Sequence, residues 1–121
     1  MADPLRDLRR PVVLAAFEGW NDAADAATEV INHLIVGYPT EDAWELDSED
    51  YYDLQLTRPC VEIGESGREI QWPTTRVAVC HLPERDLVLV YGPEPNLRWR
   101  SFAAALVSCF LSIEPEYVIV L

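Results

Sequence analysis

Two apolar runs, residues 12–17 and 87–91, constrain the fold most, because each leads through a short polar turn into a long stretch with apolar side chains at helical spacing. A continuous apolar run is typical of a strand that is covered on both faces of a sheet. Strands that alternate with helices predict an α/β fold with a mostly parallel sheet. The turns after such strands lie at the carboxyl ends of the strands, where ligands usually bind.

The remaining elements follow from apolar periodicity and from turn residues. After the first apolar run we expect a helix that begins near Asn21 or Asp22 and ends near Gly37. A second, more apolar helix is expected over residues 97–113. Further strands are expected at residues 43–47, 57–63, 68–72, 76–82, 86–91 and 117–121. The strands at 57–63 and 68–72 flank a turn and therefore predict a hairpin insertion.

Length and the pattern of the last residues bear on the domain organisation. The chain has 121 residues, 50% of them hydrophobic, which predicts one globular domain. Residues 117–121 form an apolar, strand-like run with no polar residue after it. We therefore expect residues 1–121 to be the N-terminal part of a single α/β domain whose fold is incomplete at the C-terminus.

The charge balance excludes some partners and some chemistry. Nine basic residues against 21 acidic residues give a formal net charge of −12. Such a chain is repelled by phosphate backbones and by anionic membranes, so we expect neither nucleic acid nor a membrane as a partner. All the basic residues are arginine, which excludes a phosphate-loop lysine or a Schiff-base lysine within this sequence.

The cysteines and histidines do not form a recognisable reactive site. Cys60, Cys80 and Cys109 are odd in number and lack paired spacing, which indicates a reducing compartment and a cytoplasmic location. Cys80 and His81 are neighbours in an expected strand, so their side chains point to opposite faces and cannot readily share a metal. We expect no metal and no cofactor, and the sequence identifies no catalytic residue.

The best candidate site lies in the two turns that follow the apolar runs. Its side chains are acids, amides, a tryptophan and an arginine, namely Glu18, Trp20, Asn21, Asp22, Glu94, Asn96 and Arg98. We expect the two turns to face each other across one crevice that binds a small polar ligand. In the structural alternative, the acids cap helices, Trp20 fills space between helix and sheet, and Arg98 forms an ion pair with an acid of the first turn.

Four sequence motifs lie at residues 18–23, 51–59, 72–75 and 92–100 and cover nearly all of the chain from about Pro11 onward. In their residues and their order, these motifs resemble the actinobacterial branch of the proteasome assembly chaperone 2 family. The resemblance implies a phosphorylase/hydrolase-like fold with three α/β/α layers and a homo-oligomer such as a trimer. Related eukaryotic chaperones help to assemble proteasome α-rings. The family commonly has glycine where this chain has Ala24, and a methyl group there weakens a ligand role for the first turn.

Two functions remain open at this point, and the sequence does not decide whether the protein is an enzyme. The first is a non-enzymatic binding or assembly protein, which is indicated by the acidic surface, by the very apolar second helix and by the lack of a coherent catalytic set. The second is an enzyme or sensor that binds a small polar ligand or a nucleotide between the turns at Glu18–Asp22 and Glu94–Arg98.

Overall fold

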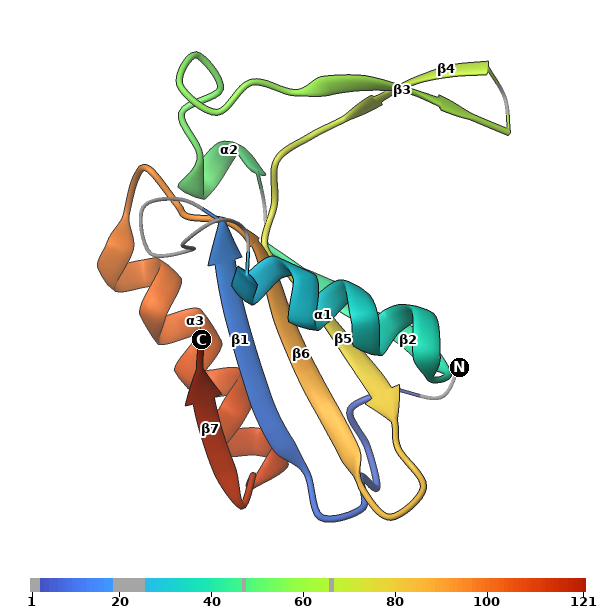
Figure 1. Ribbon diagram of the computed structural model, residues 1–121. Helices are drawn as coiled ribbons and strands as arrows, with labels where there is room; N and C mark the ends of the chain where they lie inside the picture. The colour runs from blue at the N-terminus through green and yellow to red at the C-terminus, as the bar shows by residue number, and fades with distance from the viewer. Residues whose placement is uncertain (1–2, 19–25, 47, 66) are drawn as a thin grey trace.

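The computed structural model describes residues 3–18, 26–46, 48–65 and 67–121. The helices are α1 (Ala26–Gly37), α2 (Ser48–Tyr51) and α3 (Trp99–Ile113). The strands are β1 (Val12–Glu18), β2 (Thr40–Glu45), β3 (Cys60–Gly64), β4 (Gly67–Gln71), β5 (Arg76–His81), β6 (Asp86–Pro93) and β7 (Tyr117–Val120). The described part of the chain is therefore a mixed α/β structure, as the sequence predicts (Figure 1).

Five strands form one sheet in the order β2-β5-β6-β1-β7, and β3 and β4 form a separate hairpin. β1 pairs in parallel with both β6 and β7. β5 pairs antiparallel with both β2 and β6, so the sheet is parallel on one side and antiparallel on the other. The antiparallel pairing of β5 and β6 follows from their tight connection, because parallel neighbours need a long crossover.

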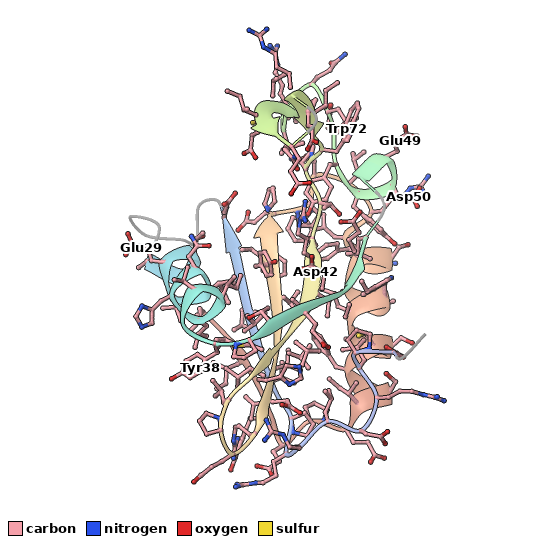
Figure 2. All side chains as sticks on the ribbon, turned by 90° about the vertical axis from the view of Figure 1, so that its right-hand side faces the viewer. Glu29, Tyr38, Asp42, Glu49, Asp50 and Trp72 are labelled. Atoms are coloured by element: carbon pink, nitrogen blue, oxygen red, sulfur yellow. The ribbon has the colours of Figure 1, made fainter. Side chains whose placement is uncertain are left out.

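The two long helices cover opposite faces of the sheet, as Figure 2 shows from the side. Alternation along the strands sends one set of side chains to each helix. The α3 side contains Val13, Ala15, Leu46, Val77, Val88, Val90, Phe102 and Leu106. The α1 side contains Ala16, Ile31, Cys80 and Leu89. The very apolar runs of β1 and β6 are explained by this double coverage, since both faces of these strands are buried.

The two edges of the sheet differ in their chemistry. β2 carries Glu41, Asp42 and Glu45, and its pairing with β5 shifts register between Asp42 and Trp44. Charges and a bulge of this kind prevent an edge from pairing with another chain. On the opposite edge, every residue of β7 is exposed and none is charged. Among the described strands, β2 therefore carries the features that protect an edge, and β7 is an apolar edge.

A buried carboxylate fastens the segment before β1 to the turn between β5 and β6. Asp86 accepts hydrogen bonds from the backbone N–H and the guanidinium of Arg9, at 2.9 and 2.8 Å. It also lies 2.9 Å from Nδ1 of His81. Burial by itself raises the pKa of Asp86, but the hydrogen bonds from Arg9 and His81 outweigh it and lower the pKa from 3.8 to about 2.

Candidate functional site

The two predicted turns begin side by side at the carboxyl end of the parallel strands. In the β1–β6 register Glu18 is opposite Pro93, and the N–H of Glu94 donates to the carbonyl of Glu18 at 3.0 Å. The two strand ends that should bring the turns together are therefore adjacent. Trp20, Asn21 and Asp22 lie outside the described residues. A shared crevice between the two turns consequently stays a prediction.

Tyr52 is a deeply buried polar side chain near these strand ends, with 2% of its surface exposed. Its hydroxyl donates to the carbonyl of Pro93 at 2.8 Å and lies 2.6 Å from Oγ1 of Thr75. Because a carbonyl can only accept, the Tyr52 proton goes to Pro93 and the Thr75 hydroxyl donates to Tyr52. Burial raises the pKa of Tyr52, and the negative charge of Glu18 also raises it. The hydrogen bond from Thr75 lowers this pKa, but by less than the other two effects raise it. Tyr52 is thus a neutral structural link between α2, β5 and β6.

Asn96 holds the segment after α2 against the turn after β6. Its side-chain oxygen accepts from the N–H of Asp53 at 3.0 Å and from the hydroxyl of Thr57 at 2.9 Å. The backbone N–H groups of Asn96 and Leu97 both donate to the carbonyl of Tyr51, at 2.9 and 3.1 Å. The amide oxygen that was predicted to bind a ligand is therefore already engaged within the chain.

Gly92 allows the ends of β5 and β6 to approach closely. Its φ of 146° lies in a region that other residues rarely adopt, and a Cβ atom there would overlap the carbonyl oxygen of Thr74. Thr74 in turn donates from its hydroxyl to the carbonyl of Leu46, and Leu46 donates from its N–H to the carbonyl of Thr75 at 3.0 Å. Three of the sequence motifs, at residues 51–59, 72–75 and 92–100, therefore meet at this end of the sheet.

Arg98 lies at the start of α3, with a left-handed backbone and no side-chain cap. Its Nη1 atom is 3.5 Å from Oδ1 of Asp50 in α2, and the two side chains are 67% and 53% exposed. Within the described part of the chain, the partner of Arg98 therefore belongs to α2 and the pair is open to water. The ion pair of Arg98 with an acid of the first turn stays a prediction, because Asp22 lies outside the described residues. The helix also begins two residues later than predicted, at Trp99.

Aromatic rings fill the space between the start of α3 and the strand ends. Phe102 is buried and contacts Phe17, Tyr51 and Trp99 edge to face, with ring centroids 5.8, 5.7 and 6.2 Å apart. Such pairs contribute about 0.5–1.5 kcal/mol beyond the area that they bury. Trp99 therefore packs against the core from a half-exposed position.

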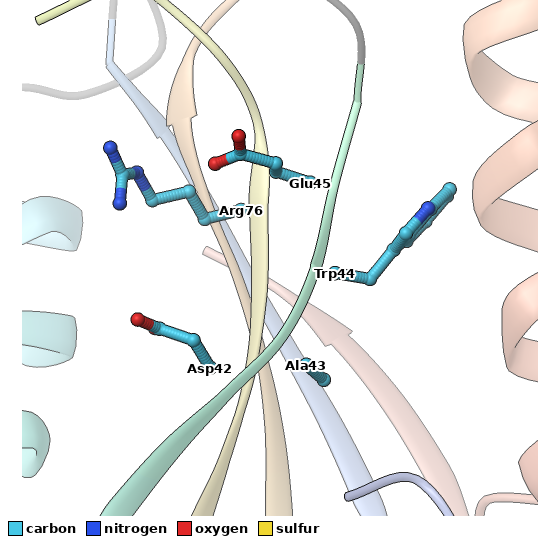
Figure 3. Close-up of a pocket in the computed structure, with 5 residues that line it drawn as sticks. All are labelled: Asp42, Ala43, Trp44, Glu45 and Arg76. Carbon is cyan, nitrogen blue, oxygen red and sulfur yellow. The ribbon is translucent and has the colours of Figure 1, made fainter. Parts of the chain in front are cut away.

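A separate shallow pocket of about 180 Å³ lies along the β2 edge (Figure 3). Asp42, Glu45 and Arg76 lie on one side of β2, and Ala43 and Trp44 lie on the other. A volume of this size holds a few water molecules and is smaller than most ligand sites.

Sequence reasoning did not single out Tyr52 and Thr75 as site residues. The one feature of the sequence that could have indicated them is that each lies in one of the four motifs. The sequence does not show that two residues 23 positions apart share a hydrogen bond. Among the described residues, no cluster of three or more His, Cys, Asp or Glu side chains is placed to hold a metal ion. None of the helices in the described ranges is long and apolar enough to cross a membrane.

The chain is similar to several solved structures from actinobacteria. A PAC2 family protein from Streptomyces avermitilis is 48% identical, with a TM-score of 0.84 over 91% of this chain and 48% of that chain. A proteasome-assembly chaperone homologue from Mycobacterium tuberculosis is 41% identical, with a TM-score of 0.81 over 90% of this chain and 48% of that chain. A Corynebacterium glutamicum protein of unknown function is 23% identical, with a TM-score of 0.81 over 93% of this chain and 42% of that chain, and shows the fold alone.

These relatives have about twice the length of this chain, which spans 48% of the first two. No curated protein matches the chain significantly. The sequence profile of the PAC2 family matches residues 16–121, which is most of the chain. Together with the two close structural relatives, this match shows that the chain belongs to the PAC2 family.

Proposed function

We propose that the chain is a non-enzymatic protein-binding component that assists the assembly of a larger complex. The observation that carries this proposal is uncovered apolar surface on α3, on β7 and on the β3–β4 hairpin. The exposed side chains are Val61, Ile63, Ile70, Val107, Leu111, Val118, Ile119 and Val120. Large exposed apolar surface on a chain of net charge −12 is typical of a protein interaction site.

The unprotected edge of the sheet supports the same proposal. Within the described residues, β7 pairs with β1 alone and carries apolar side chains, whereas the β2 edge carries acids and a register shift. A bare edge strand is a template for pairing with another strand. The proposed binding surface therefore includes β7 and the outer face of α3.

The polar groups at the strand ends support a structural role for that region. Tyr52, Thr75 and Asn96 donate to or accept from groups of the same chain. A general acid or base must instead reach a proton of the substrate. The hydrogen bonds of these three side chains connect the segment after α2 to Thr75, which precedes β5, and to the end of β6 and the turn after it.

Proteasome subunits are the partners that we infer, because one relative carries the name of a proteasome-assembly chaperone homologue. The test mixes the purified chain with recombinant α- and β-subunits of an actinobacterial proteasome and follows core-particle formation by native electrophoresis. We expect a faster or larger yield of assembled particles, and a weaker effect with Leu111→Asp on the exposed face of α3. Glu84→Gln is the matched control on a polar surface. An unchanged yield, together with no binding to either subunit, would argue against the proposal.

A small polar ligand at the strand ends is the second candidate function. It is favoured by one observation: Glu18 and Glu94 begin their turns side by side. The predicted ligand site still comprises Glu18, Trp20, Asn21, Asp22, Glu94, Asn96 and Arg98. Thermal-shift measurements against nucleotides and polar metabolites test it, with Glu18→Gln and Glu94→Gln as variants. If no compound raises the melting temperature, this alternative fails.

Three further features belong to the same proposal. We infer that the protein works in the cytoplasm, since Cys60, Cys80 and Cys109 are all free. We infer that it forms a homo-oligomer and that the family fold is a phosphorylase/hydrolase-like three-layer structure, as the family resemblance implies.

A further inference from the structure

A β-bulge in β2 gathers charged side chains on one side of the sheet. Residues three positions apart in a regular strand, such as Asp42 and Glu45, point to opposite faces. Asp42 is instead opposite Ala78, because the pairing of β2 with β5 shifts register directly after it. Glu45 is opposite Arg76, and Ala78 and Arg76 share the α1 side of β5. Figure 3 accordingly shows both carboxylates on the side of Arg76, with Trp44 on the other side.

Arg76 has no ion pair within the described part of the chain, although Glu45 is its direct register partner. Its side chain is half-buried, in a chain with a formal net charge of −12. Protection of the sheet edge accounts for the acids and the bulge of β2, but it gives no role to an arginine on the inner strand β5. The guanidinium therefore keeps its planar set of donors available for an added carboxylate.

The charges of Asp42 and Arg76 act on the same place, the hydroxyl of Tyr91. Tyr91 is opposite Arg76 in β6 and packs against the core cluster on the α1 side. Burial raises the pKa of Tyr91 most, the negative charge of Asp42 raises it further, and the positive charge of Arg76 lowers it. On this side α1 packs mainly over β1 and β6, and the pocket of Figure 3 lies where β5 and β2 continue the sheet beyond them.

A second pocket adjoins the first, because both are lined by Glu45 and Arg76. It measures about 250 Å³, and its four further lining residues are Ile70, Gln71, Trp72 and Thr74. Ile70 and Trp72 are 56% and 51% exposed, so they give this pocket an apolar wall that is open to water. The two pockets therefore form a trough with charged groups at one end and apolar side chains at the other. Each pocket is small for a drug-sized ligand, but the trough suits a small metabolite.

We propose that this trough binds a free α-amino acid with an apolar side chain. The guanidinium of Arg76 holds the carboxylate of the amino acid, and the carboxylates of Asp42 and Glu45 hold its ammonium group. The apolar side chain of the amino acid lies against Trp72 in the second pocket. The inference goes beyond the proposed function, since neither complex assembly nor a ligand between the two turns requires it.

The charge pattern of the trough selects a zwitterion over a simple ion. A simple anion at Arg76 is repelled by two carboxylates, and a simple cation at these carboxylates is repelled by Arg76. A zwitterion places a charge of the correct sign at both positions. The C-terminal residue of a peptide offers the same carboxylate but has an amide in place of the ammonium group. It therefore leaves Asp42 and Glu45 without a positive partner.

Isothermal titration calorimetry of the purified chain tests the ligand class, with L-phenylalanine as the probe. L-Phenylalaninamide lacks the carboxylate, and N-acetyl-L-phenylalanine lacks the ammonium group and mimics the C-terminal residue of a peptide. We expect each change to raise the dissociation constant more than about tenfold. No binding of L-phenylalanine at about 10 mM overturns the proposal. Equal binding of N-acetyl-L-phenylalanine overturns the free amino acid as the ligand and assigns the trough to a peptide C-terminus.

Substitutions test the charged groups of the trough. Arg76→Gln should raise the dissociation constant of L-phenylalanine more than about tenfold, and Arg76→Lys should recover only part of the affinity because lysine lacks the planar fork. The double change Asp42→Asn and Glu45→Gln should also weaken the binding of L-phenylalanine. Glu41→Gln is the matched control, since Glu41 is opposite Val79 and therefore lies on the other face of β2. It should leave the dissociation constant within about twofold, and an equal loss in this control overturns the proposed site.

The preference between two ligands separates a ligand contact of Arg76 from a merely structural role. Without the guanidinium, the carboxylates of Asp42 and Glu45 should accept the cationic L-phenylalaninamide more readily. We expect the wild-type chain to bind L-phenylalanine at least about tenfold more tightly than L-phenylalaninamide, and Arg76→Gln to reduce this ratio below about twofold. Melting curves followed by circular dichroism show whether each variant is folded. A folded Arg76→Gln variant that keeps the wild-type ratio overturns the contact between Arg76 and the carboxylate of the ligand.

Discussion

Removing the hydroxyl of Tyr52 should destabilise the fold through the two groups that it leaves behind. Tyr52→Phe keeps the buried ring but removes the donor to the carbonyl of Pro93 and the acceptor for the hydroxyl of Thr75. Thr75 is fully buried, so water cannot readily replace the lost bond. A buried polar group without a partner costs about 1–3 kcal/mol, and we therefore expect a loss of about 2–3 kcal/mol.

Changing the other partner should have a smaller effect. Thr75→Val removes the donor to Tyr52, but the Tyr52 hydroxyl still donates to Pro93. The expected loss is about 1 kcal/mol, because no buried donor is left without an acceptor. In the Tyr52→Phe background, Thr75→Val should lower the free energy of unfolding by less than it does in the wild-type protein. The reason is that the Thr75 hydroxyl has already lost its partner in that background. The double variant should thus lose less than the sum of the single variants.

Urea unfolding followed by circular dichroism measures all four proteins at a constant m-value. Burial raises the pKa of Tyr52, so its contribution is full below the unfolded pKa of about 10 and is lost as the pH rises through the folded value. The wild-type protein should therefore lose stability more steeply above about pH 10 than Tyr52→Phe does. If Tyr52→Phe changes the free energy of unfolding by less than about 0.5 kcal/mol, the proposed hydrogen-bond arrangement is not present in solution.

Three smaller experiments address other parts of the structure. Gly92→Ala should lower the free energy of unfolding by about 3 kcal/mol or more, since it adds backbone strain and an overlap with Thr74; a melting temperature equal to wild type would contradict this. The pKa of Asp86 is lowered to about 2, so its ionised carboxylate stabilises the fold above about pH 4. The wild-type protein should lose this contribution to the free energy of unfolding as the pH falls through 2, whereas Asp86→Asn should show no such loss. Arg98→Ala should change the free energy of unfolding by less than about 1 kcal/mol in urea, because its ion pair is exposed, and a larger loss would indicate a further buried contact.

The elements that sequence patterns located well are those with an apolar periodicity of their own. Both apolar runs are strands, and their ends are adjacent as expected. β2 was predicted at residues 43–47 and lies at Thr40–Glu45 instead. Glu41 and Asp42 are poor strand formers, and they are tolerated because β2 is an exposed edge. Edge position is a property of the sheet and cannot be read from the local sequence.

The candidate site was less predictable because it depends on contacts between distant segments. Asn96 looked like a ligand amide, since the sequence does not show that the segment after α2 returns to it. We expected Arg98 to pair with an acid of the first turn, and among the described residues α2 places Asp50 beside it at the surface. A short helix with no apolar stripe supplied the partner of Arg98, and the segment that follows this helix supplied the partners of Asn96. Such a helix leaves almost no periodic signal.

The motifs that carry the family resemblance therefore explain the fold more than an activity. Gly92 permits a close backbone approach, and Asn96 fastens the segment after α2. Tyr52 bonds to Thr75, which directly precedes β5, and to Pro93 of β6. These side chains are occupied within the chain, so the described part of the motifs leaves few polar groups for a substrate. Exposed apolar surface, by contrast, lies on the hairpin and on the α3–β7 side, which these internal bonds do not use. If the family fold serves assembly, partner binding should respond to changes on those surfaces, and changes at the strand ends should act mainly through stability.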